Sequence, residues 1–271
     1  MNLDLIIKKS KAIEKTILRV GFECGQSAHF GGALSLTHIL SSLFFGLMKH
    51  DPLNPRDPHR DRFILSKGHG VLAYIATLYE SGYISAAELA TFQKDDSKFI
   101  AHPVKNLDAG IETSSGSLGQ GICFAIGVAE ALKRKKSNNR VYVICGDGEC
   151  NEGSVWEAAM LANKRKLDNF TLFIDKNNFQ NDGHCADVLG DLDLKKMFES
   201  FGFNAHSVNG HNVKEICNVA SLKQNNKKPT VIVCNTIKGY GVSFMENQND
   251  WHHNRLTKKL IENEGLDINV L

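Results

Sequence analysis

Residues 140–178 read RVYVICGDGECNEGSVWEAAMLANKRKLDNFTLFIDKNN, and this stretch decides the fold. It starts and ends with two nearly continuous apolar runs, residues 140–145 and 169–175, which are typical of strands buried on both faces. Between them, residues 154–166 carry apolar side chains at helical spacing. The order strand, helix, strand predicts a βαβ unit in which the two strands are parallel.

The alternation of strand and helix patterns continues on both sides of this unit. A third β-rich run, residues 230–235, predicts another central strand. Helical patterns are present in five further segments, residues 1–20, 35–48, 71–81, 118–135 and 213–225. We therefore expect an α/β fold with a mostly parallel central sheet and helices on both faces.

Nothing in the sequence divides the chain into parts. It has no internal repeat, and its polar breaks at residues 49–61 and 94–116 lack the low complexity of a linker. We expect one domain over residues 1–271 with long functional loops. The tail after Glu246 is rich in Asn, His and Lys, and we expect it to become ordered on a partner.

Composition excludes several classes of protein. The chain has 271 residues, of which 42% are hydrophobic and 23% charged, as is ordinary for a globular protein. Its net charge of +2 provides no whole-molecule field for nucleic acid or an anionic membrane. The longest apolar stretch, residues 43–48, is far shorter than the roughly 20 residues of a membrane span. Seven cysteines without a CxxC pair suggest neither zinc cluster nor disulfide framework, and with no signal peptide we expect a cytoplasmic protein.

A candidate metal site follows the two strongest strands. Gly146, Asp147 and Gly148 come directly after the first strand, and Asn177 follows the second. Because parallel strands present their carboxyl ends at one edge of a sheet, the side chains of Asp147 and Asn177 should converge there. Carboxylate, amide and carbonyl oxygens are the ligands that Mg²⁺ prefers. An ordinary strand-ending turn is the alternative, and it stays open for Asn178.

This pattern resembles the thiamine diphosphate motif, in which a GDG is followed, as here, by an Asn thirty residues after the Asp. In that family the Asp and the Asn ligate magnesium together with a main-chain carbonyl two residues later, which here belongs to Phe179. The resemblance implies a thiamine diphosphate-binding fold of the diphosphate-binding type, with thiamine diphosphate and Mg²⁺ as cofactors. Gly146 and Gly148 would lie against the cofactor.

Other segments resemble transketolase specifically, over nearly the whole chain to about residue 253, and only the N-terminal portion of a full-length enzyme. These segments are SAHFGG at 27–32, SKGHG at 66–70, AHP at 101–103, GIETSSGSLGQG at 110–121, KGYG at 238–241 and WH at 251–252. The resemblance implies active-site roles for His29, His69, His102 and His252, with His102 touching the donor hydroxyl. It also implies that Gly116, Leu118, Lys238, His69 and His252 contact the cofactor.

The expected reaction is transfer of a two-carbon ketol unit from a ketose or its phosphate to an aldose or its phosphate. Thiamine diphosphate is the electron sink, and protein groups steer protons. Histidines donate or accept protons near neutral pH, which carboxylates do poorly without large pKa shifts. The other reading of each histidine is an ordinary structural or exposed side chain, and we keep that reading for His50, His59, His206 and His253. Two departures, Phe30 and Ser117 in place of prolines, leave room for a specialised donor or acceptor.

The activating glutamate of this family lies in a second domain, to which no residue of the chain corresponds. Glu152 resembles the glutamate that contacts it across the interface, although it could instead favour the positive end of the following helix. We expect a C-terminal partner subunit carrying the pyrimidine-binding domain, in a heterotetramer. Three alternatives stay open: a subunit like deoxyxylulose phosphate synthase, the α chain of a 2-oxoacid dehydrogenase, and a non-catalytic paralogue that serves as a binding or regulatory subunit. The sugars, and whether they belong to pentose phosphate metabolism, are left open.

Overall fold

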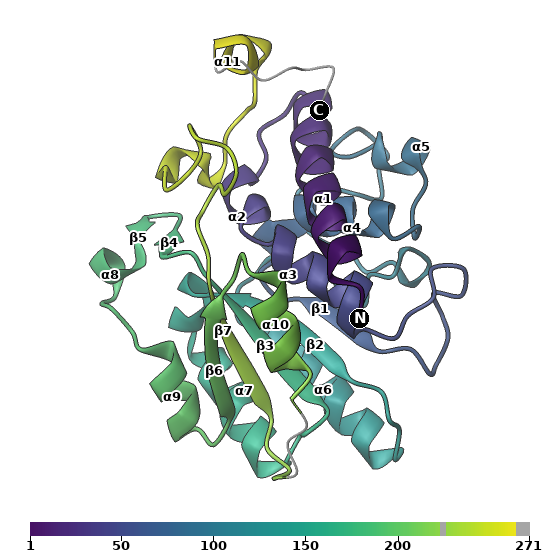
Figure 1. Ribbon diagram of the computed structural model, residues 1–271, viewed down its shortest axis with the longest axis vertical. Helices are drawn as coiled ribbons and strands as arrows, with labels where there is room; N and C mark the ends of the chain where they lie inside the picture. Colours follow the sequence, from purple (N-terminus) through teal and green to yellow (C-terminus); the bar gives the residue numbers. More distant parts are fainter. Residues whose placement is uncertain (223–225, 264–271) are drawn as a thin grey trace.

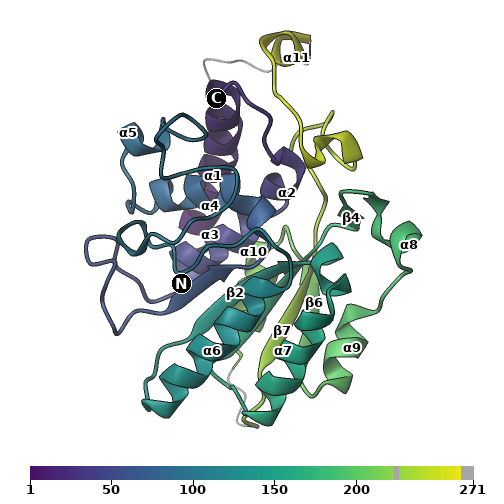
Figure 2. The ribbon, with the colours of Figure 1, turned by 180° about the vertical axis from the view of Figure 1, so that it is seen from behind.

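A parallel sheet forms the centre of the molecule (Figures 1 and 2). In the computed structural model, which describes residues 1–222 and 226–263, five strands pair in the order β1–β2–β3–β7–β6, and all neighbours are parallel. The strands are β1 (Arg62–Leu65), β2 (Val141–Gly146), β3 (Phe170–Lys176), β7 (Thr230–Asn235) and β6 (Asn204–Asn209). Because the order of strands is not the order of the chain, crossover segments must run over both faces of the sheet.

The three central strands, β2, β3 and β7, confirm the three runs predicted from the sequence. The two edge strands were not predicted. β1 has only four residues, and β6 reads NAHSVN with most of its side chains at least partly exposed, so neither shows the apolar run of a buried strand. Their extended form depends on pairing with β2 and β7, which the sequence pattern does not contain.

Helices cover both faces of the sheet, as predicted. Side chains of alternating parity on the central strands point into two separate apolar clusters, one on each face. The first face is covered by α1 (Leu3–Glu23), α2 (Phe30–Leu34), α3 (Thr37–Ser42), α4 (Val71–Glu80) and α10 (Val213–Ala220). The second face is covered by α6 (Gln120–Arg134), α7 (Gly153–Lys164) and α9 (Leu194–Ser200), and Figure 2 shows α6 and α7 side by side.

The segment predicted as one helix over residues 35–48 is helical from Thr37 to Leu47, as α3 followed by a π-helical turn, η1 (Leu43–Leu47). The chain turns at Ser35, whose hydroxyl donates to Asp175 Oδ2 at 2.6 Å and so points at the sheet. Residues Phe30–Leu47 are apolar and long enough to be considered for a membrane span, but 72% of this window is buried inside the protein, which is typical of a core segment. The helix predicted over residues 213–225 ends at Ala220, and residues 223–225 lie outside the described residues.

Short elements gather near the carboxyl ends of the strands. They are η2 (Gly68–Gly70), η4 (Gly148–Asn151), β4 (Phe179–Gln180), β5 (Gly183–His184), α8 (Cys185–Val188) and η5 (Asn249–His252). The turn η3 (Leu107–Ala109) lies elsewhere, where Asp108 pairs with Arg56 of the loop before β1. Away from this edge lie α5 (Ala86–Leu89) and α11 (Lys258–Asn263). The tail, expected to order on a partner, contacts its own chain, since Asn254 pairs with Ala28 in an antiparallel bridge. Residues 264–271 are outside the described part of the chain.

Candidate functional site

A pocket opens at the carboxyl edge of the sheet, where β1, β2 and β3 end. Its walls come from the loops after these strands, from the start of the segment before α6, and from η5. The lining residues are Lys67, His69, Leu118, Gly146, Asp147, Gly148, Glu149, Phe179, Gln180, Asn181 and His252. Segments far apart in the sequence therefore meet at one place, as parallel topology requires.

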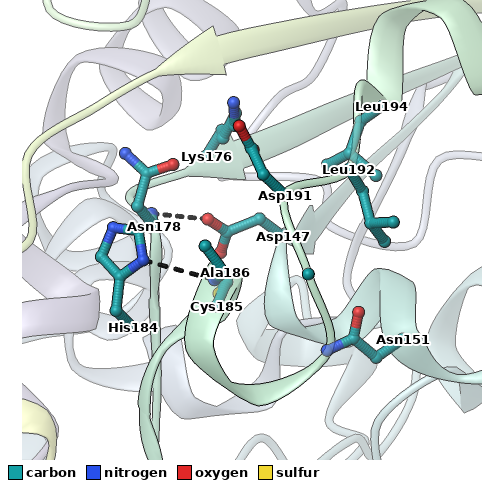
Figure 3. Close-up of a pocket in the computed structure, with 11 residues that line it drawn as sticks. Asp147, Asn151, Lys176, Asn178, His184, Cys185, Ala186, Asp191, Leu192 and Leu194 are labelled. Carbon is teal, nitrogen blue, oxygen red and sulfur yellow. Dashed lines mark hydrogen bonds between the residues drawn. The ribbon is translucent and has the colours of Figure 1, made fainter.

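Asp147 joins the loops after β2 and β3. Its side chain is 7% exposed, and Oδ2 accepts a hydrogen bond from the Asn178 backbone N–H at 2.5 Å. Oδ1 accepts from the Gly148 N–H at 2.9 Å. Figure 3 shows the Asp147 carboxylate directed at the backbone of Asn178. The carboxylate thus touches the residue next to Asn177, so the two predicted ligands lie on adjoining loops.

Asn177 is buried, and both ends of its amide have partners. Its Oδ1 accepts from the Phe179 N–H at 3.1 Å, and its Nδ2 donates to Asp175 Oδ2 at 3.2 Å. These bonds hold the amide in one orientation and bring the backbone of Phe179 beside it. The side chains of Asp147 and Asn177 and the Phe179 carbonyl supply only oxygen donors, which suit Mg²⁺ and not zinc.

Burial raises the pKa of Asp147 to about 6, and the nearby Asp175 carboxylate acts in the same direction. Burial disfavours the ionised carboxylate because water no longer stabilises its negative charge, and a nearby positive charge would favour it again. A bound cation would supply that charge. The glycine at 148 is also required here, since a Cβ would lie 2.9 Å from the Gln180 Cβ. The residues present therefore fit a magnesium ion.

A buried polar network supports this edge of the sheet, and sequence reasoning missed its centre, Asp175. This carboxylate forms an ion pair with Lys67 and accepts from the hydroxyls of Thr236 and Ser35. The sequence did contain an indication of this network: Asp175 ends an apolar strand, and a charged side chain that is buried there needs a partner. Asp175 thereby fixes the Lys67 ammonium beside the pocket.

A second lysine, Lys238, supplies positive charge at the same place. It is 1% exposed, its Nζ donates to Asn249 Oδ1 at 2.7 Å, and it lies 5.3 Å from the centre of the Phe179 ring. Burial, followed by the charge of Lys67, lowers the pKa of Lys238 to about 8. Two cations held close together in a mostly buried place favour an anion between or beside them.

The four histidines predicted for the active site, His29, His69, His102 and His252, form one cluster. Ring centroids are 4.9 Å apart for His29 and His69, 4.9 Å for His69 and His102, and 5.6 Å for His29 and His252. His252 Nδ1 lies 3.2 Å from Lys238 Nζ, which connects the cluster to the cationic side of the pocket. His253, for which we predicted no role, also lies here, with its ring centroid 4.5 Å from that of His29.

The histidine rings are neutral at physiological pH. Burial is the largest cause, and the neighbouring imidazoles act in the same direction. The pKa is lowered to about 2 for His29, to about 4 for His69 and to about 3 for His252, and it is also lowered for His102. A neutral imidazole has one donor and one acceptor nitrogen, so each ring can both give and take a hydrogen bond.

The glycine-rich loop brings Gly116 and Leu118 to the site. A Cβ at Gly116 would lie 3.1 Å from His102 Cδ2, and its φ of +154° is one that L side chains rarely adopt. A Cβ at Gly68 would lie 2.7 Å from the Gly116 nitrogen, so the two loops touch through their backbones. Leu118 lines the pocket. These glycines allow the approach that places His69 and His102 together.

Glu149 holds three loops together, and sequence reasoning did not single it out. Its buried carboxylate accepts from Ser66 Oγ at 2.5 Å, Gly119 N at 2.9 Å and Gly146 N at 3.1 Å. Glu152 differs from it, because it is exposed at the N-cap of α7 and makes no capping hydrogen bond through its side chain. The alternative for Glu152, that its charge favours the positive end of the following helix, needs no such hydrogen bond and stays open, because Glu152 is the N-cap residue of α7.

The two departures from the family pattern have different surroundings. Phe30 is fully buried, and its ring packs edge-on against Trp251 at 5.8 Å. Its effect is on the core beneath the cluster, since a Cβ at Gly21 would lie 2.4 Å from the Phe30 ring. Ser117 is exposed, next to Gly116 and Leu118. Of the two side chains, only that of Ser117 is exposed.

A further pair of histidines, His38 and His211, supports the segment that carries Lys238. His211 Nε2 accepts from the Ile237 N–H at 2.9 Å, and the His211 ring stacks on Tyr240 with centroids 3.6 Å apart. The Nδ1 atoms of His211 and His38 are 3.3 Å apart. No sequence pattern indicated this contact, because α3, the turn before α10 and the segment after β7 meet only in the folded chain.

Comparisons with known proteins agree with this geometry. The family described as "Transketolase, thiamine diphosphate binding domain" matches residues 15–265. The chain is 41% identical over 253 residues to a subunit of apulose-4-phosphate transketolase from Actinobacillus succinogenes, covering 93% of this chain and 92% of that protein. It is also 41% identical over 233 residues to a subunit of 6-deoxy-6-sulfo-D-fructose transketolase from a Clostridium species, covering 86% and 85%.

Full-length relatives are matched over less than half of their length. Human transketolase is 39% identical over 239 residues, which are 87% of this chain and 38% of that protein. The crystal structure of transketolase from Campylobacter jejuni superimposes with a TM-score of 0.89 at 32% identity, covering 99% of this chain and 44% of that one. The similarity therefore extends over the whole pocket described above.

Proposed function

This chain belongs to the transketolase family of transferases, and from that premise we propose that it is the diphosphate-binding subunit of a two-chain transketolase. The enzyme transfers a two-carbon ketol unit from a ketose or ketose phosphate to an aldose or aldose phosphate. The chain acts in the cytoplasm as a single diphosphate-binding domain, assembled with a C-terminal partner in a heterotetramer. The observation that carries the proposal is the contact of the Asp147 carboxylate with the Asn178 N–H in a pocket flanked by buried lysines.

Magnesium would be held by Asp147, Asn177 and the Phe179 carbonyl, which leaves octahedral positions for diphosphate oxygens and water. His69 and His252 line the pocket, Lys238 lies beside His252, and these three side chains would contact the cofactor on its diphosphate side. Gly146, Gly148, Gly116 and Leu118 would pack against the cofactor. Thiamine diphosphate supplies the electron sink for breaking and forming the carbon–carbon bond.

The histidine cluster would bind and orient the sugar. Neutral rings of His29, His69 and His102 present nitrogen donors and acceptors 4.9 to 5.6 Å apart by ring centroid, a spacing suited to the hydroxyls of one small polyol. Because the pKa of His29 and His69 lies far below 7, these rings are weak bases, and they would orient the sugar hydroxyls by hydrogen bonds and donate to an oxygen that gains negative charge during transfer. The partly buried position of the rings also excludes bulk water from the sugar.

A partner subunit has a suitable surface beside the pocket. Phe124 on α6 and Met160 on α7 are 42% and 54% exposed, on adjacent helices of the second face (Figure 2). Large exposed apolar side chains on a well-packed helix pair favour a protein interface. Leu118 and the exposed Glu152 precede these two helices at the pocket. A partner bound to α6 and α7 would therefore reach Glu152 and close the pocket, and two relatives are themselves named as subunits.

We further propose that the donor and acceptor sugars belong to a specialised metabolic pathway. Two of the relatives described above are named for apulose-4-phosphate and for 6-deoxy-6-sulfo-D-fructose. Ser117, in place of the proline of the family pattern, is exposed and precedes Leu118, which lines the pocket. We expect the substrates to be a ketose and an aldose carrying an anionic group at the end distant from the reacting carbon.

Thermal unfolding tests cofactor binding. The chain mixed with the protein encoded by the adjacent reading frame should melt at a higher temperature with Mg²⁺ and thiamine diphosphate, because a ligand at about 100 times its Kd stabilises the native state by about 2.7 kcal/mol. Asp147→Asn should lose most of this shift, and Asp95→Asn, at an exposed position away from the pocket, should keep it. An unchanged melting temperature in the wild type would favour the non-catalytic paralogue.

An assay of ketol transfer tests the catalytic role and the requirement for a partner. The mixture should cleave a donor from a panel of phosphorylated and sulfonated ketoses when an aldose acceptor is present, and the chain without its partner should not. Full ketol transfer by this chain alone would refute the requirement for a partner. Cofactor binding without turnover on any donor would refute the catalytic role.

A further inference from the structure

His29, His69 and His102 have a geometry that the sugar-binding role does not by itself account for. One ligand nitrogen from each ring lies within 4.8 Å of the other two. The rings come from three separate places: the N-cap of α2, the η2 turn and the loop after residue 100. Backbone contact of Gly68 with Gly116, and of Gly116 with the His102 ring, holds two of these places together. Convergence of three imidazoles is the donor set of a transition-metal site.

We propose that His29, His69 and His102 bind one divalent transition-metal ion of the Zn²⁺ and Co²⁺ class, with a set of ligands different from that of the magnesium ion. We further infer, resting on the proposed function, that this ion occupies the place of the sugar and so inhibits transfer reversibly. Three protein nitrogens leave the fourth tetrahedral position for water or a hydroxyl.

The distances require only a small adjustment. Zinc–nitrogen bonds of about 2.0–2.1 Å in a tetrahedron place the nitrogens about 3.4 Å apart. The three nitrogens, now within 4.8 Å, must therefore approach by about an ångström, which rotation of the partly exposed rings about χ2 provides. Tight packing of the loops limits larger movements.

Protonation does not compete with the ion. A histidine must be neutral to ligate a metal, and burial together with the neighbouring rings keeps the pKa of His29 and His69 far below neutral pH. The positive charge of Lys67 acts on His69, but Lys67 is itself paired with the Asp175 carboxylate, and Lys238 donates to Asn249. His252 lies beside Lys238, so we exclude it from the ligand set.

The chemistry of the donors separates the two sites. Mg²⁺ demands oxygen ligands and near-octahedral geometry, which the Asp147 loop offers and the imidazoles do not. Imidazole suits Zn²⁺ and Co²⁺. A chain saturated with Mg²⁺ should therefore still take up one equivalent of Co²⁺ at the histidines.

Visible absorption of Co²⁺ tests the site directly. Titrating the full chain with Co²⁺ in excess Mg²⁺ should produce the intense d–d bands of a four- or five-coordinate ion at one equivalent. His29→Ala and His102→Ala should each raise the Kd at least about tenfold. Asp147→Asn and His59→Ala, which leave the cluster intact, should not. Melting curves without Co²⁺ show that each variant is folded.

Two results would overturn the proposal. If the bands disappear in Asp147→Asn and persist in His29→Ala, the ion occupies the oxygen site. If no substitution changes the titration, the binding is non-specific. In the assembled two-chain enzyme, Zn²⁺ should raise the apparent KM for the donor and leave kcat at saturating donor unchanged. A fall in kcat without a change in KM would contradict the overlap with the sugar, and neither result depends on which sugar is the substrate.

Discussion

Replacing His211 tests the role of the histidine pair beneath the Lys238 segment. His211 Nε2 accepts from the Ile237 N–H at 2.9 Å, so the ring proton is assigned to Nδ1, which lies 3.3 Å from His38 Nδ1. His211→Phe keeps a flat ring to stack on Tyr240 but removes the acceptor. Leaving the Ile237 N–H without a partner should cost about 1–3 kcal/mol at pH 7. His211→Gln offers an amide oxygen to the same N–H and should cost less.

The pH dependence of the free energy of unfolding distinguishes the loss of the His211–Ile237 hydrogen bond from the effect of protonating the His211 ring. Burial, followed by His38, lowers the pKa of His211 to about 4, against an unfolded value near 6.5. The unfolded chain thus binds the proton more readily, so this stability is complete above about pH 6.5 and is lost as the pH falls toward 4. One histidine that is fully shielded from solvent changes the free energy of unfolding by at most about 1.4 kcal/mol per pH unit, and a partly exposed ring changes it by about half of that. Between about pH 6.5 and 5, His211 should account for about 1 kcal/mol.

Chemical denaturation of the chain at several values between about pH 5 and 7.5 measures both effects. The free energy of unfolding of the wild type should fall on acidification, and both variants should show a flatter curve. Only His211→Phe should be clearly less stable at neutral pH. The reasoning is refuted if the variants keep the wild-type slope, or if Gln is as destabilising as Phe at neutral pH.

Three further outcomes follow from the packing of the site. Gly121→Ala should lower the free energy of unfolding by about 1–3 kcal/mol, because its Cβ would lie 2.6 Å from the Ser66 Cα. Gly127→Ala, whose Cβ would have nothing within 4 Å, should stabilise α6 by about 0.5–1 kcal/mol. Equal melting temperatures of the two variants would contradict this. Glu149→Gln should lower the free energy of unfolding by about 1–3 kcal/mol, since the NH₂ group of the new side chain would face backbone N–H donors. Urea denaturation measures this change, and an unchanged midpoint would show that the Glu149 hydrogen bonds do not stabilise the fold. Phe124→Ser should leave the melting temperature of the isolated chain unchanged and weaken binding to the partner subunit in analytical ultracentrifugation, and full assembly would place the interface elsewhere.

Local patterns predicted the centre of the fold and several residues of the site. The continuous apolar runs of β2, β3 and β7 are long enough to show burial on both faces, and the helices between them show period 3.6. From strand order alone, Asp147 and Asn177 could be placed on one edge of a sheet. The resemblance to transketolase motifs then indicated which four histidines belong with them.

Other elements and residues could not be predicted because their roles arise only from tertiary contact. β6 is polar and becomes a strand through β7, and the helix predicted from residue 35 begins only at Thr37, after a turn at Ser35, whose hydroxyl meets Asp175. Asp175, Glu149 and His211 contact partners between 2 and 173 residues away, and such separations follow no helical or strand period.

The sequence by itself determined that this chain forms a parallel α/β sheet with an oxygen-rich loop at the carboxyl edge, because burial imposes its periodicity on neighbouring residues. Only the tertiary structure decided that Lys67 is paired with Asp175, that Lys238 is buried beside His252, and that His253 joins the cluster. The physical reason is that charge pairing and pKa depend on distances across the fold, and crossover connections set those distances independently of the local pattern.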